Sequence, residues 1–128
     1  VNCPGYIMVG NRSFPCAHRA VHGDVDLVKA ISQSCNVFFI KHGLDTTPQF
    51  LATEAKRFGF NHPTGIELPA EFKNPRVADP EWRKENWRSA NLPDGIWRGG
   101  DTANISIGQG DTLITPLQAA ANRAGVAV

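Results

Sequence analysis

Proline between residues 61 and 100 constrains the fold of this 128-residue chain more than any other sequence feature. A proline inside a helix or a central strand removes a backbone hydrogen bond and interrupts the element. Such residues recur along the stretch at short intervals: Pro63, Pro69, Pro75, Pro80 and Pro93. We therefore predict an ordered surface excursion with one short helix near residues 79–87. We expect its three tryptophans to pack within the fold rather than form a partner surface.

A long helix is predicted before this excursion. Apolar residues recur there at helical spacing, namely Leu27, Ile31, Cys35 and Phe38. Asp24 or Asp26 is a suitable N-terminal cap, and Gly43 is a plausible stop. A second helix is expected to start at Thr47-Pro48, with an apolar face that includes Phe58, and to end at Gly59.

The two ends of the chain have different character. Residues 1–23 are rich in Pro, Gly, Cys and His and are predicted as loops with one strand at Tyr6–Val9. Residues 105–114 predict a strand or turn around Gly108-Gln109-Gly110. Thr115-Pro116 then opens a last, alanine-rich helix.

Composition excludes several classes of protein. A 41% hydrophobic content supports one modest core, whereas a net charge of +1 gives no basic stripe for nucleic acid. No apolar run approaches the roughly 18 residues of a membrane span. The chain begins at Val1 and ends in AGVAV, so we expect both ends to be cut and any membrane anchor to lie outside.

The chemistry-bearing motif is Ser34-Cys35-Asn36. It sets a hydroxyl and a carboxamide on one side of the backbone, with the middle side chain turned away. By itself the triplet is also typical of polar residues that end or kink a helix. Here two further blocks follow it, TGIELPAE at 64–71 and GDTANISIGQGDTLITPLQAAAN at 100–122.

This ordered series resembles the transpeptidase domain of class B penicillin-binding proteins, especially the cell-elongation type. The resemblance covers residues 1–128 as part of one domain. It implies an α/β fold of the serine β-lactamase-like kind, of which this piece samples mainly the helical part with short strands. We expect a Cys/His loop region at 1–23, a helical pair carrying Ser-x-Asn at 24–60, a Pro/Trp-rich excursion at 61–100, and a turn and helix at 101–128.

The resemblance implies a peptidoglycan D,D-transpeptidase that cross-links stem peptides through a serine acyl-enzyme and binds β-lactams. Ser34 would be a proton-relay hydroxyl and Asn36 a substrate-orienting amide. The family's Ser-x-x-Lys and Lys-Thr-Gly motifs are absent from the chain. The nucleophile therefore lies outside it, and the fragment alone is predicted to be inactive. The alternative is a non-catalytic relative or a β-lactam sensor domain.

The same resemblance implies a membrane-anchored parent at the periplasmic face of the inner membrane, with cell-elongation proteins as partners and no organic cofactor.

The three cysteines suggest a metal site, because an odd number cannot all pair within one chain. Cys3, Cys16, His22 and Cys35 provide three sulfurs and one nitrogen, a suitable set for structural zinc. In the resembled family a His-Gly step and the residue between Ser and Asn can bind a metal, and His22-Gly23 and Cys35 occupy those positions. A Cys3–Cys16 disulfide with Cys35 as a buried thiol is the competing interpretation, and a free-standing zinc-binding interaction module is a third.

The other histidines are weaker candidates. His18 lies too close to Cys16 for easy joint ligation, and His42 and His62 are predicted at the surface or at helix ends.

Overall fold

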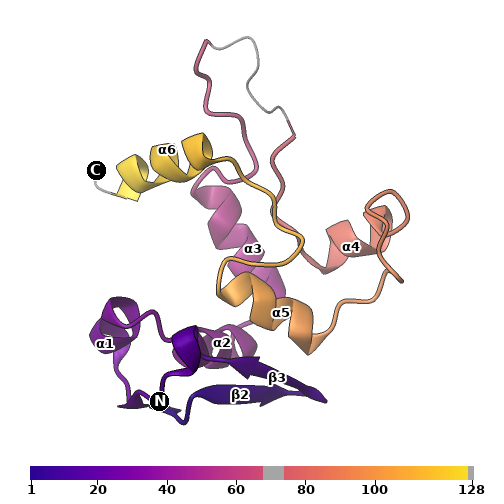
Figure 1. Ribbon diagram of the computed structural model, residues 1–128. Helices are drawn as coiled ribbons and strands as arrows, with labels where there is room; N and C mark the ends of the chain where they lie inside the picture. The colour runs from indigo at the N-terminus through magenta and orange to yellow at the C-terminus, as the bar shows by residue number, and fades with distance from the viewer. Residues whose placement is uncertain (68–73, 127–128) are drawn as a thin grey trace. The chain divides into compact units, whose positions relative to one another are not determined.

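The computed structural model describes residues 1–67 and 74–126 and divides into two compact units (Figure 1). One unit comprises Val1–Pro48 and Trp97–Gly110, and the other contains Gln49–Ile96 and the residues from Asp111 onward. The elements are β1 (Asn2–Cys3), β2 (Tyr6–Val9), β3 (Arg12–Pro15), the 3-10 turn η1 (Ala17–Arg19), β4 (Gly23–Asp24), α1 (Leu27–Ser32), α2 (Asn36–Asp45), α3 (Pro48–Arg57), α4 (Pro80–Asn86), α5 (Gly99–Ser106) and α6 (Pro116–Val126). The predicted helix-rich fold with short strands is confirmed.

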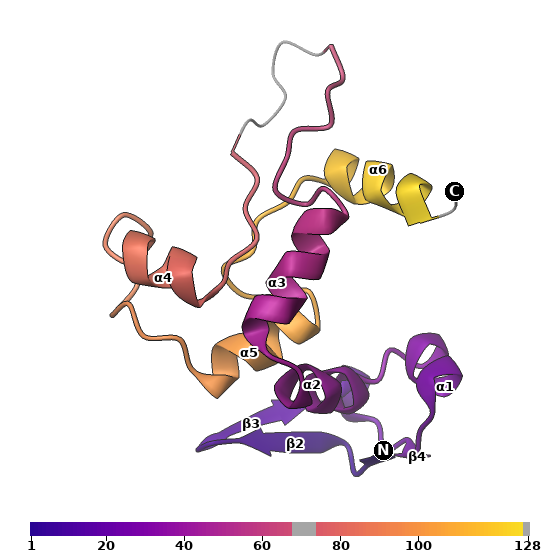
Figure 2. The same ribbon diagram turned by 180° about the vertical axis from the view of Figure 1, so that it is seen from behind.

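The first unit is built from two short antiparallel sheets and three helices. β2 and β3 form a hairpin with Tyr6 opposite Pro15, and β1 pairs with β4 through Cys3 and Gly23. α2 packs against this hairpin and against α5, as the views from both sides show (Figures 1 and 2). A small core of Phe14, Ile40 and Ala103 fills the space between these elements.

The single helix predicted from residue 24 to Gly43 is wrong. α1 ends at Ser32, and α2 begins only at Asn36 and continues past the buried Gly43. The break is a Schellman motif: the Ser34 amide donates to the Ile31 carbonyl, and the Cys35 amide donates to the Ala30 carbonyl. Ser34 is left-handed there, with φ of +52°.

The change of direction also overturns the predicted apolar face. Leu27 and Ile31 on α1 are 56% and 64% exposed, whereas Cys35 and Phe38 are buried. The predicted N-cap is confirmed for Asp26, whose carboxylate accepts a hydrogen bond from the Lys29 amide at 2.8 Å.

The second predicted helix is confirmed as α3, but its buried residue is Ala52, whereas Phe58 is exposed. The strand or turn predicted from residue 105 is wrong in its first part, because α5 extends to Ser106. Asp101 accepts from the Arg98 amide and caps that helix, so its two opening glycines do not prevent it.

The second unit contains α3, α4 and α6. The predicted short helix is confirmed as α4, and the predicted last helix as α6. The Thr115 hydroxyl accepts from the Gln118 amide, and the buried Gln118 side chain accepts from the Thr115 amide and donates to the His62 carbonyl. Residues 68–73, which include the end of the TGIELPAE block, lie outside the described residues.

No helix within residues 1–67 and 74–126 has both the length and the apolar character needed to cross a membrane.

We predict that Asp79→Ala lowers the free energy of unfolding by about 1–2 kcal/mol, because it removes the cap of α4. The Asp79 carboxylate accepts from the Trp82 amide at 2.7 Å and pairs with the Lys56 ammonium at 2.6 Å. Although burial opposes ionisation, the hydrogen bonds from Lys56 and the Trp82 amide lower the pKa of Asp79. This stabilisation is therefore complete above the unfolded-state pKa of about 3.9 and is lost as the pH falls toward the folded-state pKa.

Urea titration of wild type and variant between pH 7 and pH 3 measures both effects. Asp45→Ala is the control, because its pair with Lys41 at 3.3 Å is exposed and its loss should change stability by less than about 0.5 kcal/mol. Equal destabilisation by the two substitutions, or a difference that does not shrink in acid, would contradict the assignment.

Candidate metal and Ser-x-Asn site

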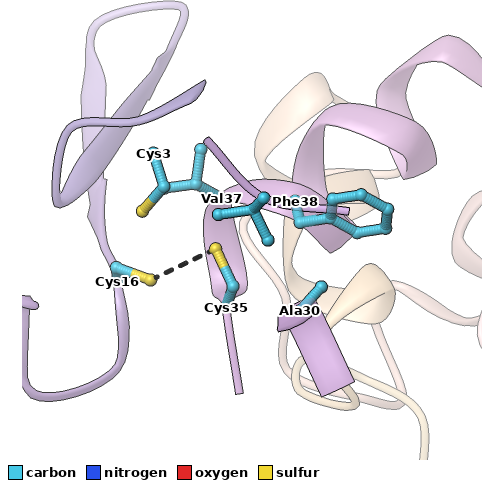
Figure 3. Packing of buried hydrophobic residues seen from close by; sticks show 7 residues of the cluster. Cys3, Cys16, Ala30, Cys35, Val37 and Phe38 are labelled. Carbon is cyan, nitrogen blue, oxygen red and sulfur yellow. Dashed lines mark hydrogen bonds between the residues drawn. The ribbon is translucent and has the colours of Figure 1, made fainter. Parts of the chain in front are cut away.

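The four predicted metal ligands come from four short segments of the first unit and meet in one place. Cys3 ends β1, Cys16 follows β3, and Cys35 lies in the turn between α1 and α2. These three cysteines are almost fully buried, and their sulfur atoms turn toward one another beside Ala30, Val37 and Phe38 (Figure 3). The half-buried His22 completes the set, and the four donor atoms all lie within 4.8 Å of one another.

The distances within this cluster suit a tetrahedral metal. The Sγ atoms of Cys16 and Cys35 are 3.8 Å apart, and His22 Nδ1 lies 3.6 Å from Cys3 Sγ and 3.5 Å from Cys16 Sγ. A tetrahedral zinc with bonds of about 2.3 Å to sulfur and 2.0–2.1 Å to nitrogen has S–S edges of about 3.8 Å and S–N edges of about 3.6 Å. The residues present therefore fit a closed four-coordinate site that can hold a metal ion.

The pKa values of two of the thiols describe how the cluster holds negative charge. Although burial opposes ionisation, backbone hydrogen bonds from His22 and Gly5 lower the pKa of the Cys3 thiol to about 7. Burial, followed by the neighbouring Cys3 and Cys16, raises the pKa of the Cys35 thiol to about 11. The cluster thus accommodates one negative charge more readily than a second, and a divalent cation would offset that repulsion.

Backbone contacts hold the loops that carry the ligands. The Cys16 amide donates to the Gly5 carbonyl at 2.8 Å, and the His22 amide donates to the Cys3 carbonyl at 3.2 Å. The Lys29 ammonium donates to the carbonyls of His22 and Asp24 at 2.7 and 2.8 Å. This role of Lys29 has no signal in the sequence, because its partners are main-chain oxygens and leave no residue pattern.

The burial of the three triplet side chains differs in the order that the sequence predicts, with the middle one turned inward. Cys35 is fully buried, Ser34 is exposed and Asn36 is half-buried. The Asn36 carboxamide donates from Nδ2 to the Pro15 carbonyl at 3.2 Å. Ser34 is thus accessible, whereas the Asn36 carboxamide faces the Pro15 carbonyl next to the ligand Cys16, and the catalytic roles of both stay predictions.

Two alternatives from the sequence can be compared with this geometry. All three cysteines are free thiols, so the Cys3–Cys16 disulfide is not formed here. His18 is exposed and lies outside the donor set, which contains His22 instead. His42 is exposed on α2 with its ring against Phe38, and His62 is exposed with its carbonyl bound to Gln118.

The family model of the penicillin binding protein transpeptidase domain matches residues 1–126. The chain therefore belongs to the penicillin-binding protein transpeptidase family, as its motifs indicated. It is 34% identical over 119 residues to the peptidoglycan D,D-transpeptidase MrdA of Haemophilus influenzae and 33% identical over 126 residues to that of Acinetobacter baumannii. These matches cover 91% and 94% of this chain but 17% of either relative, so the chain spans about a sixth of their length.

Solved structures support the same fold. The chain matches a penicillin-binding protein (PBP2) in complex with MreC from Helicobacter pylori, at 37% identity and a TM-score of 0.79. It also matches Pseudomonas aeruginosa PBP2 at 26% identity and a TM-score of 0.83. These superpositions cover 92% and 99% of this chain and 21% and 28% of the solved chains. The predicted transpeptidase fold, sampled mainly in its helical part, is confirmed.

The left-handed backbone conformation at Ser34 can be tested by substitution. Glycine is the usual residue at this position of a Schellman motif because it has no Cβ penalty. Ser34→Gly should therefore maintain the free energy of unfolding or raise it by up to about 1 kcal/mol, whereas Ser34→Val should lower it by about 1–2 kcal/mol. Chemical denaturation of the purified variants measures both changes.

Ser32→Gly is the matched control because Ser32 is also exposed but is the last residue of α1. In a helical conformation glycine costs about 0.5–1 kcal/mol, so this variant should be destabilised. Equal losses in Ser32→Gly and Ser34→Gly would show that residue 34 is not left-handed.

Proposed function

We propose that this chain is part of a peptidoglycan D,D-transpeptidase of the cell-elongation type, which cross-links stem peptides through a serine acyl-enzyme. The observation behind the proposal is an exposed Ser34 in the turn before α2 and a half-buried Asn36 at the first residue of α2, within a matched transpeptidase domain. The relatives named peptidoglycan D,D-transpeptidase MrdA support the reaction class. The nucleophilic serine and its lysine are expected outside this chain.

The two side chains have different tasks in this proposal. The Ser34 hydroxyl can both donate and accept a hydrogen bond, so it can pass a proton between the family's lysine and the departing amine. The Asn36 carboxamide has two N–H donors and can hold the carbonyl of the acyl donor. The first task lowers the barrier to proton transfer, and the second fixes orientation before bond formation.

We predict that Ser34→Ala or Asn36→Ala in the whole transpeptidase lowers its acylation rate by about 10²–10⁴-fold, which is the usual contribution of proton-transfer assistance or precise positioning. The rate is measured with a fluorescent penicillin under single-turnover conditions. Ser32→Ala is the control, because Ser32 is exposed at the end of α1 and its hydroxyl donates to the Lys29 carbonyl.

Unchanged acylation in both triplet variants would refute their catalytic roles. A whole protein that binds penicillin without turning over a stem-peptide substrate would instead support the alternative, a β-lactam sensor domain. The isolated 128-residue chain should form no penicillin adduct, since it contains neither Ser-x-x-Lys nor Lys-Thr-Gly.

We further propose that the metal bound by Cys3, Cys16, His22 and Cys35 is a structural zinc ion. Three thiolates and one imidazole are a set typical of structural zinc, and the donor distances support this choice. All four positions of a tetrahedral site would be filled by protein, so the zinc would bind no reactive water. Its role would be to fix the loop after β3 to the turn before α2.

Elemental analysis of protein purified without reductant should find about one zinc per chain, because the site supplies the four ligands that structural zinc requires. A thiol count after denaturation with chelator should recover all three cysteines. His22→Gln should lose the metal on dialysis, whereas the control His18→Gln should retain it. Absence of metal together with a single recoverable thiol would establish the disulfide alternative.

The relatives also support a proposal for the partners of the parent. The H. pylori structure is a complex of PBP2 with MreC, which supports an elongation-machinery partner of the same kind for the parent. We propose a membrane-anchored enzyme at the periplasmic face of the inner membrane, with stem peptides and β-lactams as its ligands. A free-standing zinc module that binds another protein would require this piece to fold alone.

A further inference from the structure

The contact between Asn36 and Pro15 joins the Ser-x-Asn turn to the loop that carries the metal ligands. Pro15 is the last residue of β3, and its carbonyl accepts one N–H of the Asn36 carboxamide at 3.2 Å. Among the described residues no other hydrogen bond holds this carboxamide. Its second N–H and its Oδ1 therefore remain available to a ligand.

The acceptor determines which way the carboxamide faces. A carboxamide has a donor end and an acceptor end of nearly the same shape, so packing alone cannot distinguish the two orientations. Rotation by 180° would set Oδ1 against the Pro15 carbonyl, and two acceptors would then face each other. The bond to Pro15 thus fixes Nδ2 toward β3 and leaves a single N–H to project from it.

The metal ligands flank this bond on both sides. Cys16 directly follows Pro15, and Cys35 directly precedes Asn36. Their sulfur atoms lie 3.8 Å apart in the same buried cluster (Figure 3). Each sulfur belongs to the residue next to one partner of this hydrogen bond. A metal bound to both sulfurs would therefore fix the distance between the Pro15 carbonyl and Asn36.

We propose that the Pro15 carbonyl is a positioning group for Asn36. It holds one N–H of the carboxamide, so that the second N–H can donate to the amide carbonyl in the side chain of the acyl donor. The Cys16–Cys35 end of the metal site maintains this alignment. Loss of the metal then impairs recognition of this substrate carbonyl more than the other steps of the reaction. This proposal rests on the transpeptidase function proposed above.

Two β-lactams separate positioning from general structural damage. Benzylpenicillin carries an exocyclic amide carbonyl, whereas 6-aminopenicillanic acid has an amine in its place and lacks this carbonyl. In the whole transpeptidase, Cys16→Ser should slow acylation by benzylpenicillin up to about 10²-fold but acylation by 6-aminopenicillanic acid less than about threefold. In an Asn36→Ala background, Cys16→Ser should add no further selective loss. Ser13→Ala, an exposed position on the same strand, is the control.

The proposal would be overturned if Cys16→Ser slowed acylation by both compounds equally. It would also be overturned if Cys16→Ser still caused the full selective loss of acylation by benzylpenicillin in the Asn36→Ala background. Removal of the metal by chelator provides a second route to the same comparison if Cys16→Ser does not fold, with the same outcomes expected.

A second readout does not depend on activity. In nitrogen-15 NMR spectra of the metal-loaded protein, one side-chain amide proton of Asn36 should exchange with solvent more slowly than its partner, and Cys16→Ser should abolish this difference. Two protons that exchange equally in the wild type would refute the Pro15 bond. If neither β-lactam acylates the wild type while the asymmetry is present, the proposed transpeptidase function fails and the positioning contact stands.

Discussion

The convergence of three thiols and one imidazole is the contact on which the first unit depends. Its strands have between two and four residues each, too few to bury a continuous core by themselves. The buried sulfurs bring β1, the loop after β3 and the turn before α2 to one point. A cluster of this kind needs either protonated thiols or a cation, because several thiolates in one buried site repel one another.

The Schellman motif at Ser34 links that cluster to the proposed catalytic chemistry. If α1 and α2 were one continuous helix, consecutive side chains would diverge by about 100°. The left-handed residue changes the direction of the backbone, so that Cys35 enters the core while Ser34 is exposed and Asn36 is half-buried. One short stretch of backbone therefore carries both a metal ligand and the two Ser-x-Asn groups.

The sequence predicted much of this arrangement because its signals were local. Asp26, Thr115 and the prolines at helix starts define their elements within a few residues, and the four ligands were found from donor chemistry and the resemblance together. The break at Ser34 was missed, since helical periodicity runs through it without a glycine. α5 was missed because Gly99-Gly100 suggests a turn, although Asp101 caps the helix. The Pro15 acceptor is main-chain and has no sequence signal.

X-ray absorption at the zinc edge of the zinc-loaded protein reports the number and type of atoms bound to the metal. A closed site should give three sulfur neighbours at about 2.3 Å and one nitrogen at 2.0–2.1 Å, with no bound water. Fewer than three sulfurs, or an oxygen neighbour from solvent, would contradict the closed Cys3–Cys16–His22–Cys35 site and the fixed turn that it supports.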